Sequence, residues 1–264
     1  ATLSSSTIRR CKRSGGNWQN CHDMIVAHSP EQCGKQVPFH VRDIWTLSAQ
    51  KILVAGTSYE DPENPVARIA TWDGNTFNDC PGNGVYNGEL YYSPNTTALN
   101  LAVNKKGPMN PEALLALGGS GTSSIWAGGT GGMLFFYDGN QWLSVNPAIW
   151  AETQSWNNHH VVRAIYATES DVHLVGDGVG AKSSGCRHSF YLHGAFTDGS
   201  WRFDRLLYFE NDVADCGSSP FNYAGLQDIA VDELTGDLYI VGWGPDSTIS
   251  PLKRRGLVLR LQKP

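Results

Sequence analysis

The stretch that decides the fold is SIWAGG at residues 124–129, followed by LFFYDGNQW at residues 134–142. The first part is a short apolar run that ends in glycine, which is typical of a strand covered on both faces. In the second part, Asp138-Gly139 stands between an apolar run and an aromatic residue. This predicts a tight hairpin turn, because glycine adopts a positive φ without a steric penalty.

The same pattern recurs along the chain. The Asp-Gly turn returns as WDGNTF at residues 72–77 and, more loosely, as TDGSW at residues 197–201. Apolar runs ending in glycine also occur at residues 51–56, 171–176 and 237–242. Short strands are predicted before these runs, at residues 41–45, 113–117, 162–166 and 226–230. Each unit therefore reads as strand, strand, strand, Asp-Gly turn, strand.

Repeated units of four antiparallel strands predict an all-β chain folded as a β-propeller, whose blades are four-stranded sheets around a channel. Four blades are recognisable. A fifth, degenerate blade in residues 80–111 stays open, because two of the three intervals between the strand-ending glycines exceed the roughly 40–50 residues usual for a blade. A β-sandwich or jelly roll also has many short strands, but it does not explain such a repeat.

The two ends of the chain suggest how the ring closes. The last unit stops at its third strand, residues 256–261, and GGNWQ at residues 15–19 resembles an unattached fourth strand. Pairing the two would hide two open sheet edges. We therefore expect the N-terminal strand to pair with residues 257–261, in a single propeller domain that spans residues 1–264.

The residues of the repeat also carry a resemblance. SIWAGG running into LFFYDGNQW resembles the glycine- and tryptophan-rich propeller repeats of secreted bacterial proteins, and VDELTGDLYIVG at residues 231–242 resembles NHL propellers. The resemblance implies the propeller fold. It implies almost nothing about a ligand, because propellers include lectins, hydrolases, oxidoreductases and plain scaffolds.

Composition excludes two classes of partner. With a net charge of −5 and 17% charged residues, the 264-residue chain offers no broad basic surface for nucleic acid. No apolar run approaches the roughly 20 residues that a membrane-spanning helix needs. The sequence therefore predicts a globular protein with neither a nucleic-acid partner nor a membrane span.

The six cysteines indicate an oxidising compartment. None has the spacing of a zinc knuckle, and an even number without metal spacing favours disulfides. Together with a start at Ala1, this predicts the mature form of a secreted or periplasmic protein. We expect Cys186 to pair with Cys216, with Cys11–Cys21 and Cys33–Cys80 as the remainder; six reduced cysteines in a cytosolic protein are the alternative.

Candidate binding residues gather at one face in this fold. Loops that enter first strands and loops between second and third strands emerge at the same end of the blades. Residues 38–40, 156–160, 177–188 and 243–255 belong to these loops. Arg42, Arg163 and Gln227 hold corresponding places in first strands, where they could hold an anion or water, or form salt bridges with Asp43 or Asp228. The predicted ligand-binding residues are Trp156, Asp177, Trp243, Arg42 and Arg163.

No nucleophile elbow, phosphate-binding loop or His-Glu-x-x-His motif occurs, which favours a binding protein over an enzyme. The expected function is a secreted binding or interaction propeller that recognises a glycan, a protein or a small-molecule ligand at the channel mouth. The alternative is a secreted copper- or zinc-binding protein, or a metal-dependent oxidoreductase, with His40, His159 and His160 as ligands. Against that alternative, tandem histidines in an Asn-rich loop are usually solvated.

Overall fold

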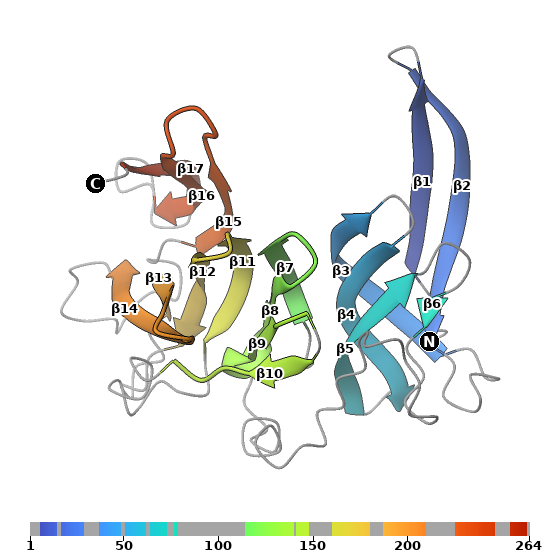
Figure 1. The fold of residues 1–264 in the computed structure, drawn as a ribbon, viewed down its shortest axis with the longest axis horizontal. Helices are drawn as coiled ribbons and strands as arrows, with labels where there is room; N and C mark the ends of the chain where they lie inside the picture. Colours follow the sequence, from blue (N-terminus) through green and yellow to red (C-terminus); the bar gives the residue numbers. More distant parts are fainter. Residues whose placement is uncertain are drawn as a thin grey trace. The chain divides into compact units, whose positions relative to one another are not determined.

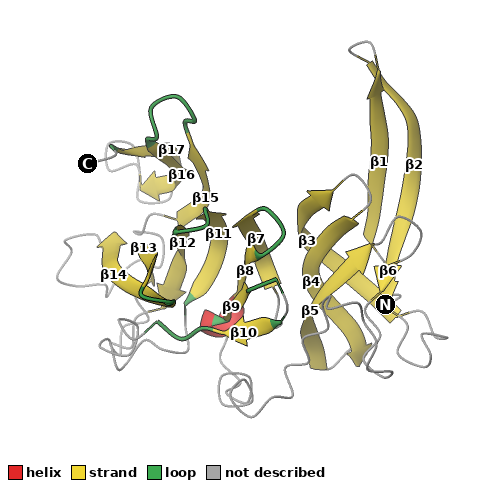
Figure 2. Ribbon diagram, viewed as in Figure 1, coloured by secondary structure: helices red, strands yellow, loops and turns green. Residues whose placement is uncertain are grey.

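The computed structural model describes the chain as strands and the turns that join them (Figure 2). The described residues are 6–14, 17–28, 37–48, 51–61, 64–72, 77–78, 114–139, 141–147, 160–179, 187–209, 225–245 and 254–262. Within these ranges there is one short 3₁₀ turn, η1 (Thr130–Gly132), and no α-helix. No helix there is long and apolar enough to cross a membrane. The chain forms two compact units, Ala1–Pro94 with Pro111–Leu114, and Asn95–Asn110 with Leu115–Pro264.

Sheet 1, in the first unit, has six strands, each antiparallel to its neighbour in chain order (Figure 1). The strands are β1 (Ser6–Ser14), β2 (Asn17–His28), β3 (Val37–Ser48), β4 (Lys51–Asp61), β5 (Asn64–Trp72) and β6 (Phe77–Asn78). In β4, the side chains of Leu53, Val54 and Ala55 are completely buried. This agrees with the continuous apolar run at residues 51–56, which predicted a strand covered on both faces.

The second unit contains three further sheets. Sheet 2 has the order β10-β9-β8-β7, sheet 3 the order β11-β12-β13-β14, and sheet 4 the order β15-β16-β17. The strands of sheets 2 and 3 are β7 (Leu114–Ser120), β8 (Ser124–Gly129), β9 (Leu134–Tyr137), β10 (Trp142–Ser144), β11 (Val161–Ala167), β12 (Asp171–Val179), β13 (Arg187–Thr197) and β14 (Ser200–Phe209). Those of sheet 4 are β15 (Gly225–Val231), β16 (Leu238–Pro245) and β17 (Arg254–Leu261). Every predicted strand quoted above from residues 41–45 onward is confirmed.

The Asp-Gly turns are hairpins, as the sequence predicts. Trp142 pairs with Tyr137 across the turn at Asp138-Gly139, and Trp72 pairs with Phe77. Between β13 and β14, Asp198 and Gly199 both have positive φ, 53° and 75°, which matches the two-residue turn that suits the twist of a hairpin.

The strand expected to close the ring has a different partner. Residues 17–19 of β2 pair with residues 12–14 of β1, so that Asn17 lies opposite Ser14 and Trp18 opposite Arg13. β17 is an end member of its sheet and pairs with β16. The two segments belong to different units, and their pairing stays a prediction. Gly-Gly between Ser14 and Asn17 is a strong hairpin signal, and a local hairpin closes a much shorter loop than a contact between distant segments.

Three first strands carry the same irregularity, a bulge of one residue. The register between β3 and β4 skips Arg42, that between β11 and β12 skips Arg163, and that between β15 and β16 skips Gln227. Each of these residues is therefore an extra residue that has no opposite residue in the register of the neighbouring strand. The correspondence of these three positions, noted in the sequence, has a structural basis.

Glycine is required beside two of these bulges. A Cβ atom at Gly176 of β12 would overlap the carbonyl oxygen of Val161, and one at Gly242 of β16 would overlap the carbonyl oxygen of Gly225. The bulge turns these carbonyl groups toward the neighbouring strand, where only a residue without a side chain leaves room. The requirement for glycine at these two positions thus accompanies the bulges.

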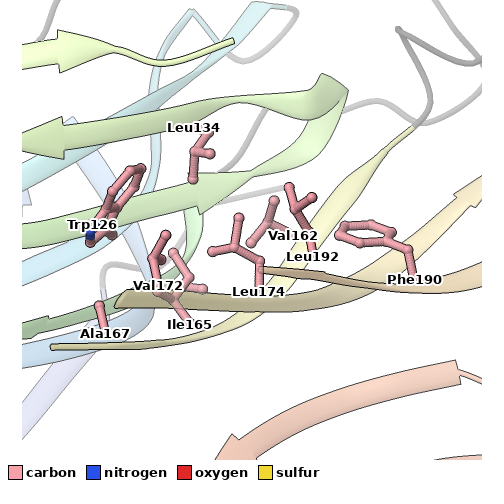
Figure 3. Packing of buried hydrophobic residues seen from close by; sticks show 10 residues of the cluster. Trp126, Leu134, Val162, Ile165, Ala167, Val172, Leu174, Phe190 and Leu192 are labelled. Atoms are coloured by element: carbon pink, nitrogen blue, oxygen red, sulfur yellow. The ribbon is translucent and has the colours of Figure 1, made fainter. Parts of the chain in front are cut away.

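Sheets 2 and 3 pack face to face through an apolar core (Figure 3). Trp126 of β8 stands at its centre, completely buried, with the ring of Trp201 from β14 edge-on at 4.7 Å. The other core residues include Leu134, Val162, Ile165, Ala167, Val172, Leu174, Phe190 and Leu192. A tryptophan at this repeat position therefore packs between sheets.

The opposite face of sheet 3 packs against sheet 4. Val175 follows Leu174 in β12 and so points to the other face, where it joins Tyr191 in a second core with residues of sheet 4. The members from sheet 4 include Leu226, Ile229, Leu238 and Ile240. Antiparallel sheets that stack face to face in chain order make the fold all-β and propeller-like. The fifth blade falls at residues 80–111, outside the described residues, and the single domain stays a prediction.

Candidate functional site

Arg163 and Asp177 form a two-pronged ion pair at the bulge of sheet 3. Arg163 Nε lies 2.7 Å from Asp177 Oδ1, and Nη2 lies 3.2 Å from Oδ2. The carboxylate side chain is 8% exposed, whereas the arginine side chain is 35% exposed. A guanidinium group fits a carboxylate in this geometry, with two parallel N–H···O bonds. The carboxylate acceptor is therefore buried, whereas the guanidinium donor is partly exposed to solvent.

Asp177 lies in a row of residues across sheet 3, between Val161 of β11 and Ser189 of β13. Ser189 is completely buried, and its Oγ accepts a hydrogen bond of 3.3 Å from the backbone N–H of Leu226 in β15. Gln227, the exposed bulge residue of β15, is the next residue in the chain. The polar residues Asp177, Ser189 and Gln227 therefore form a row of neighbours that runs from sheet 3 to sheet 4. The row lies near the bulges in the first strands of both sheets.

The prediction that Asp177 and Trp243 lie in loops is wrong. Asp177 belongs to β12, which continues to Val179, and Trp243 belongs to β16, which continues to Pro245. The Trp243 ring lies over Gly225 on the neighbouring strand, where a Cβ atom would overlap the indole. Each strand continues beyond the glycine beside its bulge, Gly176 in β12 and Gly242 in β16. Asp177 and Trp243 are therefore strand residues.

Arg42 occupies the matching bulge in sheet 1 of the first unit, and its side chain is exposed. The carboxylates of Asp43 and Asp228 each accept a hydrogen bond of 2.8 Å from the next residue's backbone N–H. The carboxylate that binds Arg163 comes from the second strand.

The histidines predicted as metal ligands do not form a described cluster. His40 is half-buried in β3, opposite Thr57. His160, just before β11, is completely buried, with its ring edge-on to Phe190 at 5.3 Å and its carbonyl group bonded to Gly132 N–H at 2.7 Å. The expectation that it is solvated is wrong. Trp156 and His159 lie outside the described residues, and within those residues no group of three or more His, Cys, Asp or Glu could hold a metal.

A second polar cluster was missed in the sequence. His173 of β12 lies directly across from His193 of β13, and their rings stack with centroids 4.8 Å apart. His173 Nδ1 lies 2.8 Å from the Tyr191 hydroxyl group. His193 Nδ1 lies 2.7 Å from Asp204 and its Nε2 3.3 Å from Asp171. One signal in the sequence could have indicated this cluster. Asp171 and His173 alternate along one strand and so share a face, and pairing that strand with residues 187–195 brings His193 beside them.

Burial controls the protonation of this cluster. The pKa of His173 falls from 6.5 to about 4, because burial disfavours its charged form and the positive charge of His193 adds to that effect. For Asp171, partial burial alone would raise the pKa. Hydrogen bonds from Ser170 and His193 outweigh burial, so the pKa of Asp171 is lower than usual.

Comparison with known proteins identifies no family. No family model matches, and no curated protein matches. Among solved structures, the chain is similar to the N-terminal domain of Nup159, with 8% identity, a TM-score of 0.41, and 87% of this chain but 46% of that one covered. A GH43 β-1,3-galactosidase with galactodeoxynojirimycin gives 11% identity, a TM-score of 0.38, and coverage of 93% and 79%.

A third similar structure comes from the GH130 family of mannoside phosphorylases, which contains glycoside hydrolases that target β-1,2-mannosidic linkages in Candida mannan. It has 11% identity and a TM-score of 0.37, with 90% of this chain and 71% of that one covered. Similarities at this level carry no argument about the function of the present chain. The functional argument therefore depends on its own residues.

Proposed function

We propose that this chain is a secreted, glycan-binding propeller, in which the four sheets are blades and the ligand binds at the bulged ends of the first strands. The observation that carries the proposal is the Arg163–Asp177 pair. It places the N–H donors of a partly exposed guanidinium group over a buried carboxylate, and its two charges balance each other. Secretion rests on the cysteine count alone.

A balanced pair suits a sugar better than an anion. Sugar hydroxyl groups both donate and accept hydrogen bonds, so they can use a guanidinium group and a carboxylate side by side. An anion would instead have to compete with Asp177 for Arg163. Gln227, exposed at the matching bulge of sheet 4, adds an amide that also donates and accepts. Trp243, half-buried near the same end of β16, adds an aromatic surface of the kind that packs against sugar rings.

Binding is favoured over catalysis at this position. Both oxygens of Asp177 accept hydrogen bonds from Arg163, so the carboxylate is held in place by a partner on both of its oxygens. A glycosidase needs a carboxylic acid that can give up a proton, together with a second carboxylate. Asp177 is poorly suited to that role and well suited to orienting a hydroxyl group.

The test is binding to a panel of immobilised neutral and acidic oligosaccharides, followed by calorimetry with those that bind. We expect at least one neutral glycan to bind and the Arg163→Gln variant to bind it at least tenfold more weakly. Arg260→Gln is the matched control, because Arg260 also pairs with a buried aspartate, Asp237, at the opposite end of β16. The control should bind as the unmodified protein does.

The absence of any glycan binding, or equal binding by both variants, would contradict the proposal. The copper or zinc alternative has no supporting observation among the described residues. Elemental analysis of the purified protein tests it independently. A stoichiometric transition metal that a chelator removes would support that alternative.

A further inference from the structure

The stacked histidines of sheet 3 lie on the face that packs against sheet 4. His173 and Val175 are two residues apart in β12 and point to the same face, and Val175 belongs to the core shared with sheet 4. Tyr166 of β11 lies opposite His173 and also packs against that core, as does Tyr191. The imidazole of His173 therefore lies on the face of sheet 3 that packs against sheet 4, beside Tyr191 of that core.

The two rings differ in their partners. Each ring nitrogen of His193 faces a carboxylate, Asp204 at 2.7 Å and Asp171 at 3.3 Å. Two carboxylate acceptors require two N–H donors, which only the positively charged imidazolium form supplies. His173 instead faces the hydroxyl group of Tyr191, which a neutral ring satisfies. A proton added to His193 therefore supplies a donor toward a carboxylate, whereas one added to His173 supplies none.

A second proton on this pair is costly. It would place two positive rings 4.8 Å apart, and it would charge a side chain that lies against the apolar core between the sheets. The charged groups that act on His173 are Asp171 of β12, His193 of β13 and Asp204 of β14. The two carboxylates favour the proton but already bind His193, whereas the core residues contributed by sheet 4 are apolar.

We propose that the His173–His193 pair is an acid-sensitive contact, which loosens the packing of sheet 3 against sheet 4 when His173 takes up a proton. A charged His173 gains most from water, and water reaches this face when the side chains of Tyr166 and Tyr191 move away from sheet 4. The hydrogen bond between Ser189 Oγ and Leu226 N–H crosses the same contact. Its amide reports on the opening, and this inference does not depend on the proposed glycan site.

The sign of the pH dependence follows from the direction of the shift. A base whose pKa is lowered by folding, here from 6.5 to about 4, binds its proton more readily in the unfolded chain. Stability is therefore complete above pH 6.5 and is lost as the pH falls toward 4. Between pH 7.5 and 4.5, this one group raises the unfolding equilibrium constant on the order of 100-fold.

Two measurements test the proposal. The first is urea unfolding of the full chain and of His173→Gln at pH 7.5 and 4.5. The factor by which the unfolding equilibrium constant rises between these two pH values should be on the order of 100-fold smaller in the variant. Hydrogen exchange at the Leu226 amide should be faster at pH 4.5 in the unmodified protein than in His173→Gln at the same pH. Equal pH dependence and equal exchange in both proteins would overturn the proposal.

NMR titration of the histidine rings in the unmodified protein keeps the test decisive even where the variant folds poorly. The His173 ring should titrate near pH 4, and a midpoint near 6.5 would overturn the proposal. His193→Gln is the matched control, because it removes the neighbouring charge but leaves His173 in place. It should raise the His173 midpoint, since a stacked cation no longer opposes the proton; an unchanged or lower midpoint would contradict the role of the pair.

Discussion

Replacing Gly176 by alanine tests the link between bulge and glycine on which the site depends. The added methyl group would overlap the carbonyl oxygen of Val161 and approach the Phe190 ring to 2.9 Å. Phe190 is completely buried and the carbonyl group belongs to the backbone, so neither can move without disturbing sheet 3. Overpacking of this kind usually costs about 1–3 kcal/mol, and a backbone clash lies at the upper end. We expect a loss of about 3 kcal/mol.

Thermal and urea unfolding measure this loss. For a unit of this size, about 3 kcal/mol corresponds to a melting temperature lower by roughly 6–12 °C. Gly256→Ala is the control, because a Cβ atom there meets only open space and alanine is better than glycine in a strand by about 0.5–1 kcal/mol. It should therefore melt at or slightly above the temperature of the unmodified protein. If Gly176→Ala also melts there, the bulge does not require glycine.

Three further predictions concern the ion pair, the core and the cysteines. Asp177→Asn should lower the free energy of unfolding by about 1–3 kcal/mol in urea, because it leaves a half-buried guanidinium group without its carboxylate; no loss would contradict a role of the pair in stability. Trp126→Ala should cost about 3–5 kcal/mol in thermal unfolding through the cavity it leaves, whereas Leu143→Ala, at an exposed site, should stay within about 0.5 kcal/mol. Equal losses would place Trp126 outside the core. Peptide mapping without reduction should find Cys186 bonded to Cys216, and free thiols at both positions would remove the argument for secretion.

Local signals made most strands predictable from the sequence. An apolar run and an Asp-Gly turn depend on residues that are close in the chain, so the strands at residues 51–56, 124–128 and 171–176 and their hairpins could be predicted. The corresponding positions of Arg42 and Arg163 were also visible. The sequence did not indicate that both arginines are bulge residues. A bulge is a property of two paired strands, and the pairing register is not visible in one strand alone.

The errors arose where a residue's environment is set by distant residues. The end of each second strand was placed at the glycine that closes its apolar run. Here it makes room for a carbonyl group, and the strand continues to include Asp177. His160 was expected to be solvated because of its polar neighbours in sequence, yet Phe190, thirty positions later in the sequence, buries its ring. The His173–His193 pair was likewise not predicted, because the two residues lie opposite each other only in the register that β12 and β13 adopt.

The bulges have a consequence for protein engineering. A bulge residue is excluded from the ladder of strand pairs, so its side chain can change while the paired residues on either side keep their register. The chain already carries arginine at two such positions and glutamine at a third, Gln227. A combinatorial library at Arg42 and Gln227 would sample new surface chemistry on an unaltered scaffold, provided that each neighbouring glycine is kept, whereas Arg163 has to stay because it pairs with the buried carboxylate of Asp177.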